Sequence, residues 1–181
     1  MKGVVFNLLE DVVTQGHGAD AWDAILDAAG ADGAYTSLGD YADEELERIL
    51  ASAAGALGLP ADDVLRVFGR EAAPRFLARY PFHDGHASAA AFLATLDDVV
   101  QPQVAQIFRG SSPPRLDPEL DGRQLVLRTA STRGLCAVLE GMVEGVAGLF
   151  GEVATIEQAS CVRRGDACCT LVCSFAEVRE P

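Results

Sequence analysis

Apolar residues recur every three or four positions from residue 3 to residue 108, and this spacing predicts amphipathic helices. The first helix, over residues 3–15, turns inward the positions Val4, Val5, Leu8, Leu9, Val12 and Val13. Four further helices are expected over Asp20–Ala29, Asp43–Leu57, Pro60–Phe68 and Glu71–Arg79. Acidic residues near the starts of these helices and glycines after two of them are the usual helix boundary signals.

The stretch from Phe92 to Arg133 is the central segment of the chain. It is predicted to contain an apolar helix, a Pro-Pro turn, a short acidic link and a strand. The helix is expected over Ser88–Phe108, with the inward positions Phe92, Leu93, Leu96, Val99, Val100, Val104 and Ile107. Gln101 lies in the middle of this face, and a buried amide needs a hydrogen-bond partner or a ligand. The next residue, Pro102, predicts a kink and disfavours helical geometry at residue 101. The pair indicates either a pocket wall or a core helix whose glutamine bonds to neighbouring backbone.

After residue 108 the apolar pattern changes to the alternation that is typical of strands. Strands are expected over Gln124–Thr129, Val153–Ser160 and Cys168–Phe175. The last two are joined by a tight turn at Arg163–Asp166, with Cys161 before this turn and Cys169 beyond it. On the last strand, Cys169, Leu171, Cys173 and Phe175 should share one face.

One more helix is expected between the first and second of these strands, over Arg133–Phe150. Its inward positions would be Leu135, Val138, Leu139, Met142, Val146 and Leu149. A chain that is helical first and mixed later predicts an α+β fold. We expect a single domain over residues 1–181, with a helical part over about 1–65 and a mixed part over about 66–181.

Composition narrows the classes of partner. With 181 residues and 49% hydrophobic residues, the chain has enough apolar material for one well-packed domain. The net charge of −13 argues against binding to nucleic acid or anionic membranes. Apolar runs fall short of the roughly 18 residues that a membrane span requires, and Glu10 and Asp11 interrupt the apolar start, unlike a signal peptide. Five cysteines in the last third fit a reducing cytoplasm, as buried thiols or metal ligands.

Several short segments recur together, in this order, in one known family. They are Met1–Leu9, Ala21–Asp23, Tyr35–Tyr41, Phe68–Gly69, Tyr80–Pro81, Phe92–Leu93, Pro113–Pro114 and Ser131–Cys136. Over essentially its whole length the chain resembles the haem-nitric oxide/oxygen binding (H-NOX) domains, bacterial relatives of the haem domain of soluble guanylate cyclase. The resemblance implies the H-NOX fold, a haem, and nitric oxide sensing that signals to a separate histidine kinase or diguanylate cyclase.

The resemblance also assigns positions around the haem, and two of them depart from the family pattern. The family's iron is held by a histidine, and Gln101 occupies that place; a count shifted by one residue gives Val100 instead. The family grips the haem propionates with a Tyr-x-Ser-x-Arg motif, which here reads Thr129, Ser131 and Arg133. Without the histidine we expect weak, exchangeable haem or none.

Two further positions follow from the resemblance on the distal side of the haem. Val138 stands where oxygen-binding members carry a tyrosine, and Leu9 where some carry a tryptophan. An apolar distal wall favours nitric oxide over oxygen, because it offers bound oxygen no hydrogen-bond donor. Pro114, in the Pro-Pro turn, is placed at the pocket on the other side.

Some bacterial H-NOX domains carry a structural zinc on three cysteines and one histidine. The resemblance assigns these cysteines to Cys136, Cys161 and Cys169, and the histidine position to Gln158. A fourth ligand would come from Gln158, Cys168 or water. The alternative is that the cysteines are small buried apolar residues.

An enzyme is not indicated, because no nucleophile stands near a plausible base and no phosphate-binding loop follows a strand. His83 and His86 have a metal-ligand spacing, but Asp84-Gly85 between them predicts a turn instead of a helix. Three functions therefore stay open: a gas sensor with haem, a haem-less relative that binds another apolar ligand or a protein partner, and a structural zinc protein.

Overall fold

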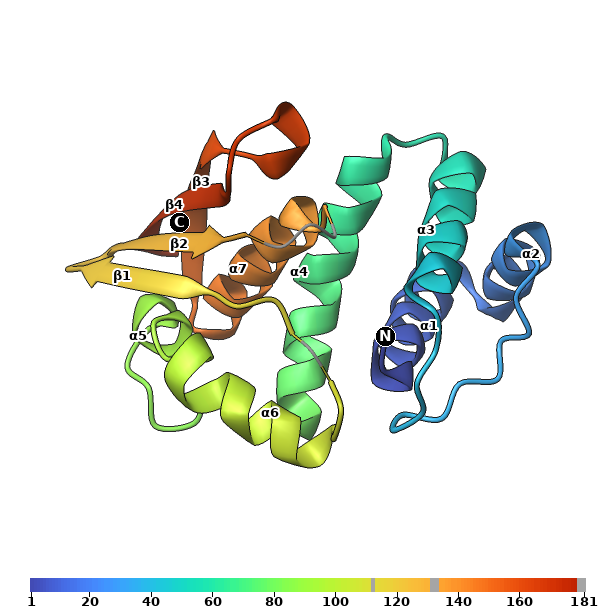
Figure 1. The fold of residues 1–181 in the computed structure, drawn as a ribbon, viewed down its shortest axis with the longest axis horizontal. Coiled ribbons are helices and arrows are strands. Elements are labelled where there is room, and N and C mark those ends of the chain that lie inside the picture. Colours follow the sequence, from blue (N-terminus) through green and yellow to red (C-terminus); the bar gives the residue numbers. More distant parts are fainter. Residues whose placement is uncertain (112, 131–133, 179–181) are drawn as a thin grey trace.

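The computed structural model describes residues 1–111, 113–130 and 134–178. Three helices, α1 (Gly3–His17), α2 (Ala19–Ala29) and α3 (Asp43–Leu57), lie together on one side of the long helix α4 (Ala61–Arg79) (Figure 1). On the other side follow α5 (Ala89–Leu93), the π-helical turn η1 (Leu96–Val100) and α6 (Gln101–Ile107). The remaining elements are β1 (Asp117–Asp121), β2 (Gln124–Thr129), α7 (Cys136–Leu149), β3 (Glu152–Ser160), the 3-10 turn η2 (Val162–Arg164) and β4 (Cys169–Glu177).

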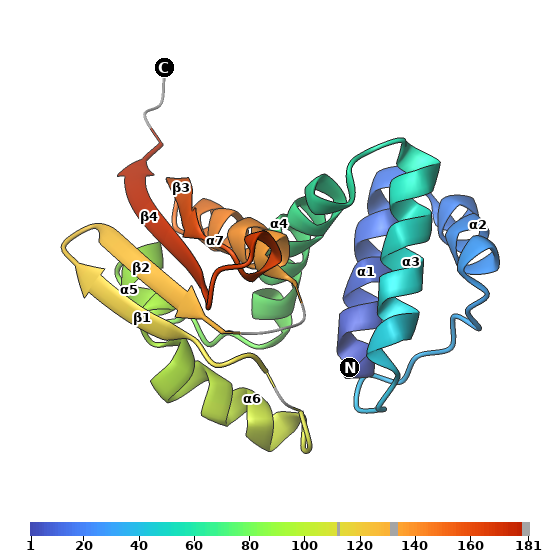
Figure 2. The same ribbon diagram turned by 45° about the horizontal axis from the view of Figure 1, so that its top comes forward.

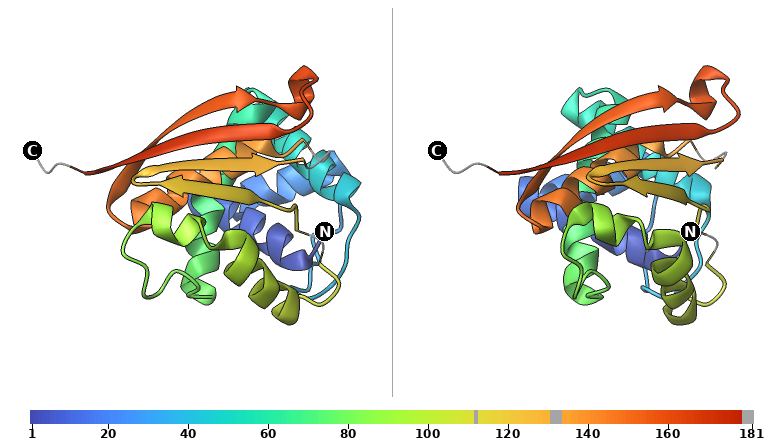
Figure 3. Two further views of the ribbon diagram at one scale, coloured as in Figure 1. Left: turned by 60° about the vertical axis from the view of Figure 1, so that its left-hand side comes forward. Right: turned by 90° about the vertical axis from the view of Figure 1, so that its left-hand side faces the viewer.

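The four strands form one antiparallel sheet in the order β1-β2-β4-β3, with helices behind it in the views of Figure 3. The predicted α+β class is confirmed. So is the inward face of β4, where Cys169, Leu171, Cys173 and Phe175 are all buried. The prediction of a mere acidic link before β2 is wrong, because Asp117–Asp121 pairs with β2 as an edge strand. Because of its acidic residues and Pro118, this segment lacks the apolar alternation that predicts a strand. Acidic residues and proline are, however, both typical of sheet edges.

Helix α4 corrects a second prediction, since the two helices expected over Pro60–Phe68 and Glu71–Arg79 are one. Gly69, which lies between the two predicted helices, is a contact point within the single helix. A Cβ atom there would lie 2.2 Å from the carbonyl oxygen of Val138 on α7. The α4–α7 packing is tight at two more glycines, where an added Cβ would lie 1.9 Å (Gly141) or 2.3 Å (Gly145) from a backbone carbonyl of α4.

This glycine contact also explains which face of α7 is buried. Met142 and Leu149, expected to point inward, are 37% and 42% exposed. The buried positions are instead largely small ones, including Ala137, Gly141 and Gly145. Periodicity of large apolar residues misses such a face, because glycine and alanine carry little hydrophobic signal.

Two apolar cores share α4. The first lies among α1, α2, α3 and the start of α4, and the second lies among α5, α7 and the inner face of the sheet. Figure 2 shows α4 crossing from one group of elements to the other. The neighbouring residues Ala72 and Ala73 belong to different cores, the first and the second respectively. Within the described ranges, no helix combines the length and apolar character needed to cross a membrane.

Candidate functional site

The helix predicted over Ser88–Phe108 is interrupted just before Pro102. A π-helical turn, η1, precedes α6, and the N–H of Gln101 reaches back to the carbonyl of Leu96. This wider turn absorbs the missing donor of Pro102, which takes a position in the first turn of α6 where a proline is tolerated. Gln101 itself has helical backbone angles (φ −61°, ψ −40°), so the expected departure from helical geometry at this residue is wrong.

Helix α6 is also less buried than predicted. None of the residues of α6 is fully buried. Phe108, just beyond the end of the helix, is buried at 2% exposure. Val99 and Ile107, both expected to face inward, are 45% and 38% exposed. Gln101 is half-buried, while Val100, the alternative under a shifted count, is buried at 6% exposure.

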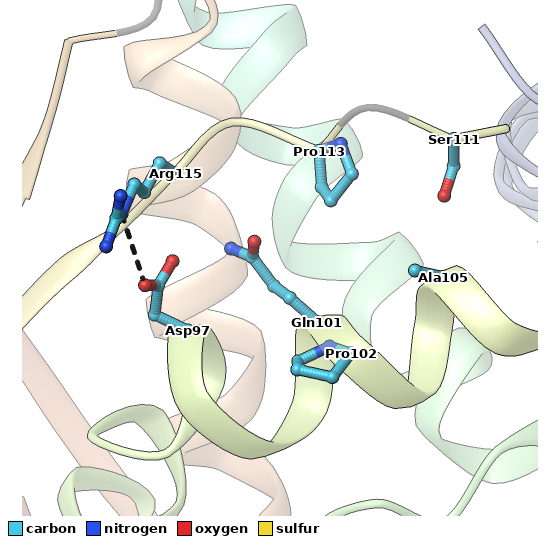
Figure 4. Close-up of a pocket in the computed structure, with 7 residues that line it drawn as sticks. All are labelled: Asp97, Gln101, Pro102, Ala105, Ser111, Pro113 and Arg115. Carbon is cyan, nitrogen blue, oxygen red and sulfur yellow. Dashed lines mark ion pairs between the residues drawn. The ribbon is translucent and has the colours of Figure 1, made fainter.

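The side chain of Gln101 bonds to the Pro-Pro segment. Its Nε2 donates to the carbonyl oxygen of Pro114 at 3.0 Å. One turn earlier, Asp97 accepts from the N–H of Leu116 at 3.1 Å and lies 3.6 Å from Nε of Arg115. Figure 4 shows Asp97 and Gln101 pointing from the helical segment toward the chain that carries Pro113 and Arg115. These contacts tie η1 and α6 to the segment before β1.

An open groove of about 370 Å³ lies along this tie, lined by Asp97, Gln101, Pro102, Ala105, Ser111, Pro113 and Arg115. Its lining mixes a carboxylate, an amide and a guanidinium with two proline rings. The hydroxyl oxygen of Ser111 is buried and has no hydrogen-bond partner among the described residues. A groove of this kind differs from the enclosed and mainly apolar cavities that hold cofactors.

The distal positions lie elsewhere, in the first core. Leu9 is 2% exposed, and Val138 packs against the same apolar cluster. The cluster also includes Phe108, with Val104 of α6 packed against it. Side chains from the helix of Gln101 and from the distal wall thus belong to one continuous apolar cluster.

Aromatic rings complete this cluster. Phe108 lies 5.5 Å from Tyr80 and 6.3 Å from Phe76, measured between ring centroids, and Tyr80 stacks on Phe82. Protein side chains therefore cover Leu9 and Phe108, and Gln101, predicted to stand at the iron-ligand position, is bonded through its amide to Pro114. An amide oxygen is also a poor ligand for haem iron compared with imidazole. The residues present do not fit a histidine-type haem site.

Of the three propionate positions, only Thr129 can be described. It is 8% exposed on β2, paired across the sheet with Cys169 of β4. Ser131 and Arg133 lie outside the described residues. The assignment of the propionate motif stays a prediction.

The three predicted zinc cysteines do come together. The Sγ atoms of Cys136, Cys161 and Cys169 all lie within 4.8 Å of one another, and the three residues are buried. Cys136 and Cys169 are paired as a disulfide, and Sγ of Cys161 lies 3.8 Å from Sγ of Cys136. The three elements that meet here are the start of α7, the end of β3 and the start of β4.

Neither predicted protein source of a fourth ligand joins these sulfurs. Oε1 of Gln158 accepts a hydrogen bond from Arg164 at 3.2 Å. Cys168 is half-buried on the other face of the strand, with its Sγ 3.8 Å from Oγ1 of Thr170. His83 and His86 lie in the loop after α4, where Nδ1 of His86 is 3.2 Å from the carbonyl of His83.

Two polar residues of the structure escaped the sequence analysis. Asp97 lines the groove, and its spacing of four from Gln101 would have placed both side chains on one helix face. Glu140 is 6% exposed on α7 and pairs with Arg66 of α4. Glu140 and Glu144 are two acids on an otherwise apolar helix, and this placement was the available signal for a partner.

The chain is an α+β domain in which a split helix is bonded to the segment that leads into a four-stranded antiparallel sheet. The chain belongs to the Haem-NO-binding (HNOB) family, whose model matches residues 2–158. Members of this family are gas- and haem-sensing domains, so the general role of the chain is sensory.

Solved structures agree with this assignment. An H-NOX protein from S. oneidensis in the Fe(II)NO ligation state is 29% identical, with a TM-score of 0.91 over 98% of this chain and 100% of that chain. A mutant of the S. oneidensis protein in the Fe(II) state gives a TM-score of 0.92 at 29% identity, over 99% and 98%. The Fe(II) unliganded H-NOX protein from K. algicida, 20% identical over the whole of both chains, shares the fold at a TM-score of 0.85. A search among curated proteins finds no match.

Proposed function

We propose that this chain is an H-NOX-family sensory domain whose input is not a histidine-ligated haem. The observation that carries the proposal is the side chain of Gln101, which donates to the carbonyl of Pro114 at the position that the resemblance assigns to the iron ligand. The packing of Leu9 and Phe108 into one apolar cluster supports it, since a bound macrocycle would need that space.

The groove at Gln101 is the place where we expect such an input to act. Asp97 and Gln101 tie η1 and α6 to the segment before β1, so an occupant that displaces either contact would free this segment. The output would go to a separate signalling protein, of the histidine kinase or diguanylate cyclase type that the family resemblance predicts. A cytoplasmic location fits the acidic, cysteine-containing composition.

Haem reconstitution tests the proposal directly. The protein and its Gln101→His variant are each mixed with one equivalent of haem under reducing conditions, and the Soret band is recorded after gel filtration. We expect no stoichiometric Soret band from the natural sequence. Because the apolar cluster fills the space, the histidine alone should restore little. The exposed neighbour Gln103→His serves as the control for adventitious binding by any added histidine.

The spectra of the two proteins distinguish the proposed function from its alternatives. A full Soret band from the natural protein would overturn the proposal. A five-coordinate ferrous spectrum from Gln101→His alone would show that the pocket is intact and that only the iron ligand has been lost.

The second candidate function is nitric oxide sensing through a weakly held haem. It is favoured by the fold similarity to the Fe(II)NO protein from S. oneidensis and by the apolar character of Leu9 and Val138. It requires Phe108 and its aromatic neighbours to move when haem enters. If it holds, a ferrous complex with nitric oxide should form, and a stable oxygen complex in air should not.

A further inference from the structure

The groove between α6 and the segment before β1 combines an open cation with a buried hydroxyl. Arg115 lines one end of the groove, and its side chain is 93% exposed. Within the described ranges its one polar contact is with Asp97, 3.6 Å from Nε, so both terminal nitrogens of the guanidinium are without a partner there. Ser111 lies at the opposite end, and Figure 4 shows its hydroxyl directed toward the side of Ala105.

The hydroxyl of Ser111 is the stronger sign of a ligand. Its oxygen is buried and finds no hydrogen-bond partner in the part of the chain that the structure describes. Buried hydroxyls are nearly always paired in folded proteins, because their desolvation without a hydrogen bond is unfavourable. A change of its single χ1 rotamer would turn the hydroxyl further into the groove, where an acceptor atom of a ligand could reach it.

The positions of these two groups call for an elongated ligand. Figure 4 shows Pro113 between Arg115 and Ser111. The two residues are four positions apart, so their Cα atoms can be separated by up to roughly 13 Å. Between them the groove is lined by Pro113 on one side and by Pro102 and Ala105 on the other. A ligand with a polar group at each end and a short apolar link matches this lining better than a compact anion does.

The chemistry of the two ends specifies an organic acid. A guanidinium with free N–H groups binds a carboxylate through parallel hydrogen bonds. Asp97 borders this end, but one of its oxygens accepts from the N–H of Leu116 at 3.1 Å and the other faces Nε of Arg115. Its charge is therefore already compensated in part. At the far end, the hydroxyl of Ser111 supplies a donor for a carbonyl or carboxylate oxygen.

We propose that this groove binds a small, elongated organic acid, with its carboxylate at Arg115, an acceptor oxygen at Ser111 and a short aliphatic chain between them. The proposal deepens the proposed function and rests on it, because it names the chemical class of the input. It also gives this input a way to act. A carboxylate that engages Arg115 draws the guanidinium away from Asp97, and so weakens one contact between η1 and the segment before β1.

The experiment titrates the whole chain, without haem, with aliphatic dicarboxylates from succinate to suberate at constant pH and ionic strength. Heteronuclear NMR follows the backbone amides. We expect saturable shifts concentrated on the groove and at Leu116, whose N–H donates to Asp97. Affinity should peak at one chain length, since a shorter acid cannot reach both ends and a longer one must bend. The monocarboxylate of the best length should bind about tenfold more weakly, because it offers Ser111 no acceptor.

Three variants test the two ends separately. Arg115→Gln should weaken binding of the dicarboxylate and of the monocarboxylate, each about tenfold or more. Ser111→Ala should weaken the dicarboxylate and leave the monocarboxylate unchanged. Arg109→Gln is the matched control, because it removes the same charge from an exposed residue that does not line the groove. Far-UV circular dichroism checks that each variant is folded.

Three results would overturn the proposal: amide shifts that do not saturate at any chain length, a dicarboxylate held equally well by Ser111→Ala, or equal weakening by Arg109→Gln. The last would show a diffuse effect of charge in place of a site. The chain-length series uses the natural protein and stays decisive if a variant fails to fold. Haem binding is measured separately by the Soret band, so failure of the acid to bind is distinguishable from failure of the proposed function.

Discussion

The side-chain nitrogen of Gln101 lies 3.0 Å from the carbonyl oxygen of Pro114, thirteen residues along the chain. The position that the family resemblance gives to an iron ligand is therefore used here as a tie between α6 and the extended segment before β1. Asp97 adds a second tie to the same segment, through the N–H of Leu116. The first prediction concerns the strength of this connection.

Replacing Gln101 by alanine removes the bond to Pro114 and should lower the free energy of unfolding by about 1 kcal/mol. The matched control is Gln103→Ala on the same helix, which is exposed and should change stability by less than about 0.5 kcal/mol. Urea denaturation measures both. Equal stabilities for the two variants would mean that the Gln101 contact contributes nothing to the native state.

The close packing of α4 against α7 at Gly69, Gly141 and Gly145, here called the α4–α7 seam, gives the second prediction. Gly141→Ala places a methyl group 1.9 Å from the carbonyl oxygen of Arg66, so the helices must separate. We expect a loss of about 2–4 kcal/mol, since overpacking against backbone cannot be relieved by a rotamer change.

Gly148→Ala is the control for the same helix. Beyond the local backbone of its own helix, no atom of the described residues lies within 4 Å of an added Cβ there. Alanine should therefore stabilise the helix by roughly 0.5–1 kcal/mol. In both thermal and urea denaturation, the unfolding midpoint should fall for Gly141→Ala and rise for Gly148→Ala. A tolerated Gly141→Ala would show that the seam is looser than described.

Arg66 and Glu140 give the third prediction. Arg66→Met leaves Glu140, only 6% exposed, without its cationic partner, and should cost about 1–3 kcal/mol, allowing for the partial exposure of the arginine. Arg70 and Glu144 form a longer and more exposed pair, 3.8 Å apart, so Arg70→Met should cost less than about 0.5 kcal/mol. The double variant Arg66→Met/Glu140→Gln should recover much of the loss if an unpaired buried charge is its cause.

Cys173 gives the fourth prediction, a pH dependence. Burial, with a smaller contribution from Glu140, raises the pKa of this thiol from 9.0 to about 11. Between these values the unfolded chain ionises at Cys173 while the folded chain keeps its proton, so stability is full below pH 9 and falls as pH rises toward 11. The loss attributable to this group should reach roughly 2–3 kcal/mol.

Chemical denaturation between pH 8 and about 10.5 measures this loss. Cys173→Ala should show a shallower fall than the natural protein, whereas Cys168→Ala, at a half-buried thiol, should keep the natural slope. Tyr35, whose pKa is also raised by burial and by Glu45, adds a loss of the same sign, and the comparison between variants cancels it. Identical slopes for all three proteins would refute the assignment to Cys173.

Periodicity predicted the elements whose apolar spacing is regular and missed or misplaced the others. Helices α1 to α3 and strands β2 and β4 follow from apolar spacing because each buries one face of apolar side chains, and β3 follows from its alternating pattern. The edge strand β1 and the small-residue face of α7 did not follow. The first is stabilised by pairing with β2, and the second by glycine contacts with α4, and neither leaves a hydrophobic signal in its own segment.

For the site, residue chemistry located the right segments but not their partners. Gln101 stood out as an amide within an apolar stretch, and the family resemblance grouped the three cysteines. Pro114 as acceptor and Asp97 as a second tie depend on how the chain folds back. The π-turn that lets Pro102 sit beside a helical Gln101 is a local adjustment that spacing rules cannot foresee.

Ala72 and Ala73 are adjacent in α4, yet they pack into different cores. Successive residues of a helix point about 100° apart, so α4 presents one side to each core. Any rotation of α4 about its own axis must therefore withdraw side chains from one core while pressing others into the second. Because one helix borders both cores, a change in packing among the first three helices bears directly on the core that lies against the sheet.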